Sequence, residues 1–191
     1  MAKKIALTGG IGSGKSIALN FAKKLGYKTL SCDEISRKIY RDKGLKAEIK
    51  KAFGEDVFSS DGRLIRKRLA LVVFGDSEKV KKLNSITHPV IVDKMLSVIN
   101  SSKKSCVVEV PLLFENNLEK YFDKVIVIMR DKKARIDAVI GRDGISEEEV
   151  EKRIKNQYDY AKLPKNAHTL IYNDGTVAEF EDKLRQALID D

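Results

Sequence analysis

The chain has 191 residues, of which 42% are hydrophobic and 34% are charged, so it is long enough to bury one core and to carry a small appended lobe. No apolar run approaches the ~20 residues that a membrane helix needs, and the two cysteines, Cys32 and Cys106, lack the C-x-x-C spacing of a zinc site or a redox pair. The net charge of +9 is compatible with nucleic-acid binding and equally with small polyphosphate ligands.

The first element of the chain is a short apolar segment, Lys4–Thr8, followed at once by Gly9-Gly10-Ile11-Gly12-Ser13-Gly14-Lys15-Ser16. This is the G-x-x-x-x-G-K-S spacing of a P-loop, and the helical pattern behind it completes the strand–loop–helix context. The glycines let backbone N–H groups turn toward a phosphate, and the helix adds unpaired N–H groups. We expect Lys15 to reach the β- and γ-phosphates and the Ser16 hydroxyl to bind Mg²⁺. The loop therefore predicts a protein that handles a nucleoside triphosphate.

Further apolar segments are predicted as buried strands at Lys28–Ser31, Cys106–Val110, Lys124–Met129 and Thr169–Tyr172. Helical patterns separate them, which predicts an α/β fold: a three-layer sandwich of the P-loop NTPase type with about five parallel strands. Capping-box patterns mark three helix starts, at Ser31, Ser146 and Thr176. We expect the helix that begins after Ser146 to run to about Tyr160.

The stretch between the second and third predicted strands, about residues 34–102, carries several helical patterns and no convincing core strand. A crossover between two parallel strands needs only one helix, so this stretch is too long for a bare connection. We interpret it as a helical insertion that forms a second lobe.

Three charged residues are expected near the P-loop, because open α/β sheets bind ligands at the carboxyl ends of their strands. Asp33, just past the second strand, is suited to deprotonate an attacking hydroxyl, or it merely complements a helix dipole. Glu109 stands where P-loop proteins often carry a magnesium-associated acid, and an exposed acid at a strand end is the competing interpretation. Arg142, in the turn after the next helix, either neutralises a transferring phosphoryl group or caps a helix end. For His88, a packing or capping role competes with ligand binding.

Short motifs run in order along nearly the whole chain. They are Thr8 to Ser16, Asp33-Glu34-Ile35-Ser36-Arg37, Asp61-Gly62-Arg63-Leu64-x-Arg66, Val73-Phe74, Ile86-Thr87-His88-Pro89-Val90-Ile91, Val110-Pro111-Leu112-Leu113-Phe114-Glu115, Arg142-Asp143-Gly144, Gln157 and Asn173-Asp174-Gly175. Together they resemble the dephospho-coenzyme A kinase family. The Thr-His-Pro and Val-Pro-Leu-Leu-x-Glu segments are more diagnostic than the P-loop itself.

The resemblance implies an ATP-dependent enzyme that phosphorylates the ribose 3′-hydroxyl of dephospho-coenzyme A, giving coenzyme A and ADP in the final step of coenzyme A synthesis. It implies a nucleotide-binding core at residues 1–33 and 103–191, a lid at about 141–160 and an acceptor-binding insertion at 34–102. The expected partners are ATP and dephospho-coenzyme A, without nucleic acid or membrane. A monomer is favoured over an oligomer. Because removal of a signal peptide would also remove the P-loop, we expect a cytoplasmic location.

The resemblance also assigns roles to individual residues. Asp33 would be the catalytic base, with Lys15 and Arg142 as catalytic cations. The residues expected to bind ATP are 9–16, Asn173 and Gly175. The residues expected to bind the acceptor are Asp33, Arg66, His88, Pro111 and Leu112. Mg²⁺ is expected to bind Ser16 and Glu109.

Several positions depart from the family's usual pattern, namely Ile17, Ser31, Glu109 and Ala138. At residue 138 the family commonly has a second lid arginine, and Arg135, one helical turn earlier, is a candidate substitute. Two alternatives stay open at this point. One is a kinase of the same fold with another nucleoside or nucleotide acceptor. The other is an ATPase or nucleotide-switched protein that binds nucleic acid, against which the Thr-His-Pro segment argues.

Overall fold

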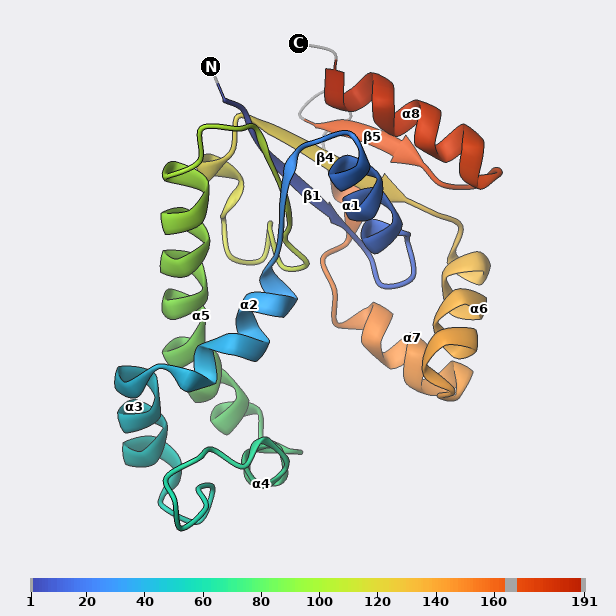
Figure 1. Ribbon diagram of the computed structural model, residues 1–191. Helices are drawn as coiled ribbons and strands as arrows, with labels where there is room; N and C mark the ends of the chain where they lie inside the picture. The colour runs from blue at the N-terminus through green and yellow to red at the C-terminus, as the bar shows by residue number, and fades with distance from the viewer. Residues whose placement is uncertain (1, 164–167, 190–191) are drawn as a thin grey trace. The chain divides into compact units, whose positions relative to one another are not determined.

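The structure is a computed structural model that describes residues 2–163 and 168–189. The chain divides into two compact units, Met1–Ser31 with Ser101–Asp191, and Cys32–Asn100, and each is described by itself (Figure 1). Within the described residues, no helix combines the length and the hydropathy needed to cross a membrane.

The first unit contains one parallel sheet in the order β2-β3-β1-β4-β5. Its strands are β1 (Lys4–Gly9), β2 (Lys28–Ser31), β3 (Cys106–Glu109), β4 (Lys124–Met129) and β5 (Thr169–Tyr172). The central strand β1 is buried on both faces, with Ile5, Ala6 and Leu7 no more than 1% exposed. This burial explains its continuous apolar run. The predicted α/β fold with five parallel strands is confirmed.

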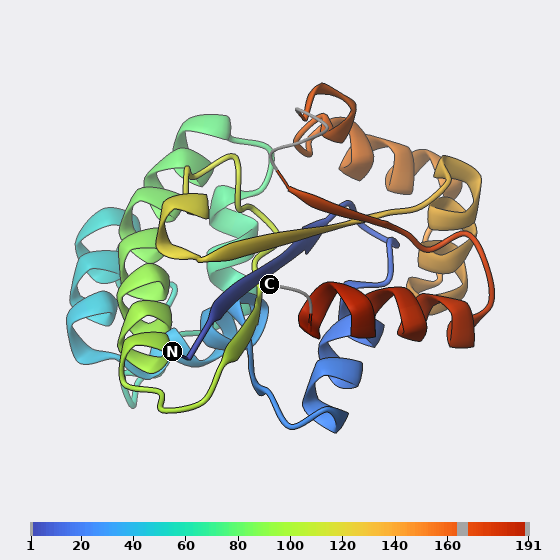
Figure 2. The ribbon, with the colours of Figure 1, turned by 90° about the horizontal axis from the view of Figure 1, so that it is seen from above.

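Two helices of this unit pack on one face of the sheet, as Figure 2 shows: α1 (Lys15–Lys24) and α8 (Val177–Ile189). Phe21 of α1 and Phe180 of α8 belong to the same buried cluster as the sheet residues Ile5, Leu7 and Ile126. The capping box predicted at the start of α8 is present. The backbone N–H of Thr176 donates to Glu179 Oε2 at 2.8 Å, and the N–H of Glu179 donates to Thr176 Oγ1 at 3.3 Å.

A helical hairpin follows β4 and consists of α6 (Lys132–Asp143) and α7 (Glu147–Lys155) (Figure 1). Ile136 and Val139 of α6 form a small core with Val150 of α7, and Ile11 of the P-loop packs against it. Gly144, with φ 66°, ends α6 in the left-handed region. Arg142 and Asp143 therefore lie in the last turn of α6, and not in the turn after it as predicted.

The predicted end of α7 near Tyr160 is wrong, because this helix stops at Lys155. The N–H of Tyr158 donates to Glu115 Oε1 at 2.9 Å instead of to a helical carbonyl. Tyr160 then begins a 3₁₀ turn, η3 (Tyr160–Lys162). A second 3₁₀ turn of this unit, η2, spans Glu119–Tyr121.

The second unit is helical. Its elements are α2 (Cys32–Lys38), the 3₁₀ turn η1 (Ile39–Arg41), α3 (Lys43–Phe53), α4 (Arg66–Val73) and α5 (Ser77–Asn100). Helices α2, α3 and α4 pack against α5, and the buried residues include Ile39, Ile49 and Met95. The β-pairing in this unit is an isolated bridge between Phe58 and Leu64.

Candidate active site

The P-loop lies at the carboxyl end of β1, and α1 begins directly behind it at Lys15. Gly12 and Gly14 have φ values of 75° and 106°, in the region that residues with a Cβ rarely adopt. A Cβ added at Gly12 would also collide with the backbone carbonyl oxygen of Arg135. Two of the glycines of the motif are therefore required by the shape of the loop and by its close packing.

Side chains hold the carbonyl oxygens of five consecutive P-loop residues, 9–13. The Lys15 Nζ donates to the first two, Gly9 at 2.9 Å and Gly10 at 3.0 Å. Other segments supply the next three donors, which are Arg135 Nε to Ile11 O at 2.9 Å, Arg130 Nη1 to Gly12 O at 3.2 Å, and Asn173 Nδ2 to Ser13 O at 2.8 Å.

This arrangement determines which way the amides of the loop face. In a planar trans peptide the C=O and the following N–H point in opposite directions. The N–H groups of Gly12 and Gly14 are therefore turned away from the side chains that hold the preceding carbonyls. An anion-binding loop requires this arrangement, in which the backbone N–H groups face the space for the anion and the carbonyl oxygens face away from it.

Two buried polar atoms at the loop have no hydrogen-bond partner among the described residues: the Ser13 hydroxyl oxygen and the Arg130 Nε. Buried polar groups in folded proteins are nearly always paired. A phosphate oxygen is a suitable acceptor for either donor. Cations of the described residues that contact the loop include Lys15, Arg130 and Arg135. Partial burial lowers the pKa of Arg135 from its ordinary value.

Glu109 ends β3 and lies in register with Leu7 of β1 and Ser31 of β2. Side chains alternate along a strand, so Glu109 points to the same face as Val107, which packs in the cluster beneath α1. That face carries the N-terminal turn of α1, where the Ser16 side chain is exposed. Among the described residues, no group of three or more His, Cys, Asp or Glu side chains is placed to hold a metal. A hydroxyl and one carboxylate suit Mg²⁺, which binds few protein groups and completes its shell with phosphate and water.

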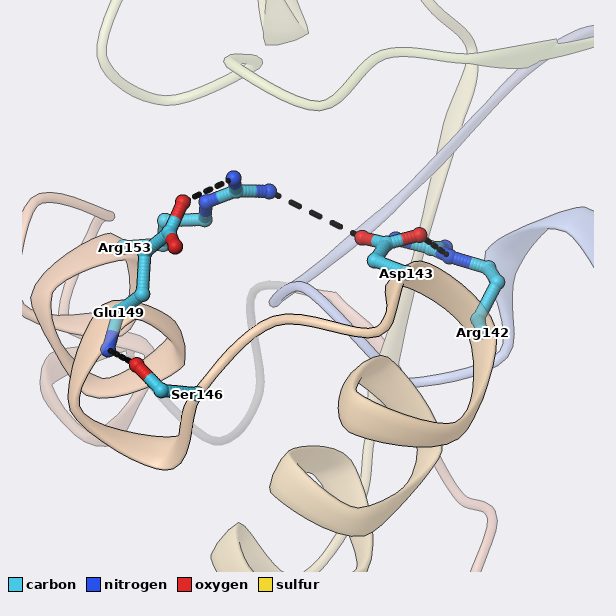
Figure 3. Close-up of polar contacts among 5 residues, drawn as sticks. All are labelled: Arg142, Asp143, Ser146, Glu149 and Arg153. Carbon is cyan, nitrogen blue, oxygen red and sulfur yellow. Dashed lines mark hydrogen bonds and ion pairs between the residues drawn. The ribbon is translucent and has the colours of Figure 1, made fainter.

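The Arg142 guanidinium forms two hydrogen bonds to Asp143, as Figure 3 shows. Asp143 also lies 3.8 Å from Arg153 Nη1, and Arg153 pairs with Glu149 at 2.8 Å. The hydrogen bonds that Arg142 donates to Asp143 raise the pKa of Arg142, and the negative charge of Glu109 adds to this effect. The side chain of Arg142 is 60% exposed, so it is accessible to a ligand.

The other predicted ATP-binding positions are in the loop after β5. Asn173 is buried against the P-loop, and its amide makes the bond to Ser13 described above. Gly175 is close to Glu179 of α8, whose carboxylate a Cβ at this position would meet. Pro111 and Leu112 follow β3 after one intervening residue, Val110, and Leu112 is 40% exposed.

The remaining predicted residues belong to the helical unit. Asp33 is exposed in the first turn of α2, and its backbone carbonyl accepts a hydrogen bond from Arg37 Nε at 3.3 Å. Arg66 is the first residue of α4 and stacks over the ring of Tyr40 at 5.2 Å. His88 is half-buried in α5, next to Pro89.

Some residues at the loop had no role in the predicted site. Arg130 follows β4 directly, and a basic residue just after a strand at the ligand-binding edge was the available signal. Gln157 belonged to the family pattern without a role, and its Oε1 accepts a hydrogen bond from the Ile11 N–H at 2.9 Å. The hydroxyl of Tyr160 lies 3.3 Å from Thr8 Oγ1, and burial raises its pKa.

Comparison with known proteins supports the resemblance to the dephospho-coenzyme A kinase family that the sequence motifs indicated. The model of the dephospho-CoA kinase family matches residues 3–179. The chain is 36% identical over 189 residues to the dephospho-CoA kinase of Geobacillus kaustophilus, covering 96% of this chain and 94% of the relative. It is also similar to a crystal structure from Thermus thermophilus, with a TM-score of 0.82 and 31% identity over 98% of this chain and 96% of that one. The dephospho-CoA kinase from Campylobacter jejuni superposes with a TM-score of 0.67 and 29% identity, again covering 98% and 96%. Because the family model and these relatives match nearly the whole length of the chain, the chain belongs to the dephospho-CoA kinase family.

Proposed function

We propose that this protein transfers the γ-phosphoryl group of ATP to the ribose 3′-hydroxyl of dephospho-coenzyme A, releasing coenzyme A and ADP. The observation that carries the proposal is the family match over residues 3–179, in a chain where side chains hold the carbonyls of P-loop residues 9–13. A loop held in this way has the conformation for a triphosphate before the ligand arrives, so binding loses little conformational entropy in ordering the loop.

The nucleotide side of the reaction is assigned to the first unit. The amides of residues 9–16 would bind the phosphates, and Asn173 and Gly175 would border the adenosine. On ATP binding, Lys15 would exchange its bonds to Gly9 and Gly10 for phosphate oxygens. Ser16 and Glu109 would hold Mg²⁺, which neutralises charge on the β- and γ-phosphates.

The acceptor side is assigned largely to the helical unit, residues 32–100, which we propose binds dephospho-coenzyme A. Asp33 would accept the proton of the 3′-hydroxyl as its oxygen attacks phosphorus. Arg66 and His88 would contact the acceptor, together with Pro111 and Leu112 after β3. Arg142 would offset the charge of the transferring group, with residues 141–160 acting as a lid that keeps water out. We expect a cytoplasmic monomer.

The test is incubation of the purified protein with ATP, MgCl₂ and dephospho-coenzyme A, with the product identified by mass. The expected product is heavier by one phosphoryl group, and nucleosides tested in parallel should react far more slowly. Asp33→Asn should lower turnover at least a hundredfold without weakening ATP binding. Glu34→Gln, which alters the neighbouring exposed carboxylate, is the matched control. Equal turnover of a nucleoside would contradict the acceptor, and full activity of Asp33→Asn would contradict the assigned base.

A further inference from the structure

The peptide groups on both sides of Ile11 are held by two side chains, Arg135 of α6 and Gln157, which lies two residues after the end of α7. Gln157 Oε1 accepts a hydrogen bond from the N–H of Ile11 at 2.9 Å. Arg135 Nε donates to the carbonyl oxygen of Ile11 at 2.9 Å. The same Gln157 oxygen lies 3.4 Å from Arg135 Nη2, so the two side chains also contact each other. We call Arg135 and Gln157 together the Ile11 clamp.

The clamp restrains both backbone torsions of Ile11. Its N–H belongs to the peptide that links residues 10 and 11, and its C=O belongs to the peptide that links residues 11 and 12. A rotation of either peptide plane would break one of the two bonds to the clamp. Because the Ile11 carbonyl is held on the side of α6, the N–H of Gly12 is turned the other way. A flip of this peptide would replace that N–H with a carbonyl oxygen, which repels phosphate.

The position of the clamp explains why its bonds should be strong. The guanidinium of Arg135 lies against Gly10, where an added Cβ would meet it, and the side chain is partly buried. A charged donor in such surroundings makes a stronger hydrogen bond than it would in water. The side chain of Ile11 packs at the same place against the small core of the hairpin. The hairpin and the segment directly after it therefore hold both the backbone and the side chain of Ile11.

The geometry points to Arg135 and Gln157 as positioning residues for phosphoryl transfer, which act through the Ile11 backbone to set the P-loop amides for the triphosphate. This inference rests on the proposed function for the reaction it serves, but its first readout is nucleotide binding alone. According to this inference, ATP binding requires the P-loop motif and also two side chains, Arg135 and Gln157, that lie more than 120 residues farther along the chain.

The test uses Arg135→Met, Gln157→Met and the double variant, because methionine matches glutamine and the alkyl part of arginine in length and removes the hydrogen bonds. Each single variant should weaken the affinity for ATP with MgCl₂ about tenfold by titration calorimetry, the effect of losing about one hydrogen bond. The KM for ATP should rise in parallel, while the KM for dephospho-coenzyme A stays within twofold. Arg135→Lys keeps a donor for the Ile11 carbonyl and should recover part of the loss. Lys133→Met, at an exposed position of α6, is the control and should leave all these values unchanged.

The double variant distinguishes a clamp from two independent contacts. If both residues act through the Ile11 backbone, the double variant should bind ATP about as weakly as the worse single variant. Losses that multiply, affinities within twofold of the unchanged protein, or an equal rise in the KM of both substrates would each overturn the inference. If the unchanged protein bound ATP and failed to phosphorylate dephospho-coenzyme A, the proposed function would fall while calorimetry still tested the clamp.

Discussion

Arg142 and Asp143, adjacent residues at the end of α6, are joined by two hydrogen bonds, from Nε to Oδ1 at 2.7 Å and from Nη2 to Oδ2 at 2.9 Å (Figure 3). The pair holds the planar guanidinium in one orientation. Asp143 is itself held from the other side by Arg153. Arg142 must exchange this carboxylate for phosphate oxygens if it is to act on the transferring group.

Replacement of Arg142 by alanine should lower turnover by about a thousandfold, the usual effect of losing an arginine that stabilises a transferring phosphoryl group. Arg142→Lys should recover only part of this, because lysine keeps the charge and loses the two-pronged geometry. Steady-state rates at saturating ATP and acceptor measure the effect. Arg153→Ala, which removes the other partner of Asp143, is the control and should change turnover only a few-fold. A rate for Arg142→Ala within threefold of the unchanged protein would show that this arginine does not take part.

Asn173 should be sensitive to the loss of its amide donor in particular. Its Nδ2 donates to the Ser13 carbonyl in a buried position, and aspartate at this site offers only acceptors. Asn173→Asp should therefore lower the free energy of unfolding by about 1–3 kcal/mol and weaken ATP binding more than Asn173→Ala does. Urea unfolding and calorimetry provide the two measurements. An aspartate variant as stable as the unchanged protein would mean that the Ser13 carbonyl needs no donor.

Removal of divalent cations with EDTA should abolish phosphoryl transfer, and added MgCl₂ should restore it. If Glu109 helps to hold Mg²⁺, Glu109→Gln should raise the MgCl₂ concentration for half-maximal turnover about tenfold. Binding of ATP in the absence of the metal should not weaken. An unchanged MgCl₂ requirement would leave Glu109 with a structural role at the end of β3.

The buried hydroxyl of Tyr160 predicts a steeper loss of stability at alkaline pH. Burial raises the pKa of this phenol in the folded protein above its unfolded value of about 10. Its contribution to stability is therefore fully present below pH 10 and is lost as the pH rises toward the folded-state pKa. Above pH 10 the unchanged protein should lose unfolding free energy more steeply than Tyr160→Phe, by at most about 1.4 kcal/mol per pH unit. Urea titrations at a series of pH values measure this difference, and parallel curves would contradict it.

Local sequence patterns predicted a structural element correctly where neighbouring residues alone determine that element. The P-loop was identified because its glycines and Lys15 occupy fixed spacings, and β4 because Lys124–Met129 is a short apolar run between helical patterns. The helix start at Thr176 was confirmed because a capping box needs only residues three apart. The end of α7 was predicted wrongly because Glu115, 43 residues earlier, takes the N–H of Tyr158. The roles of Asp33, Arg66 and His88 stay predictions.

The amino-acid sequence by itself determined the family, the parallel sheet and the presence of a phosphate-binding loop, since each depends on residue types at fixed separations along the chain. Only the tertiary structure decided what holds that loop. Arg130, Arg135 and Asn173 reach the carbonyls of residues 12, 11 and 13 from segments 118, 124 and 160 residues away. A buried carbonyl requires a donor but does not specify where in the chain that donor stands, so its source emerges only when the segments fold together.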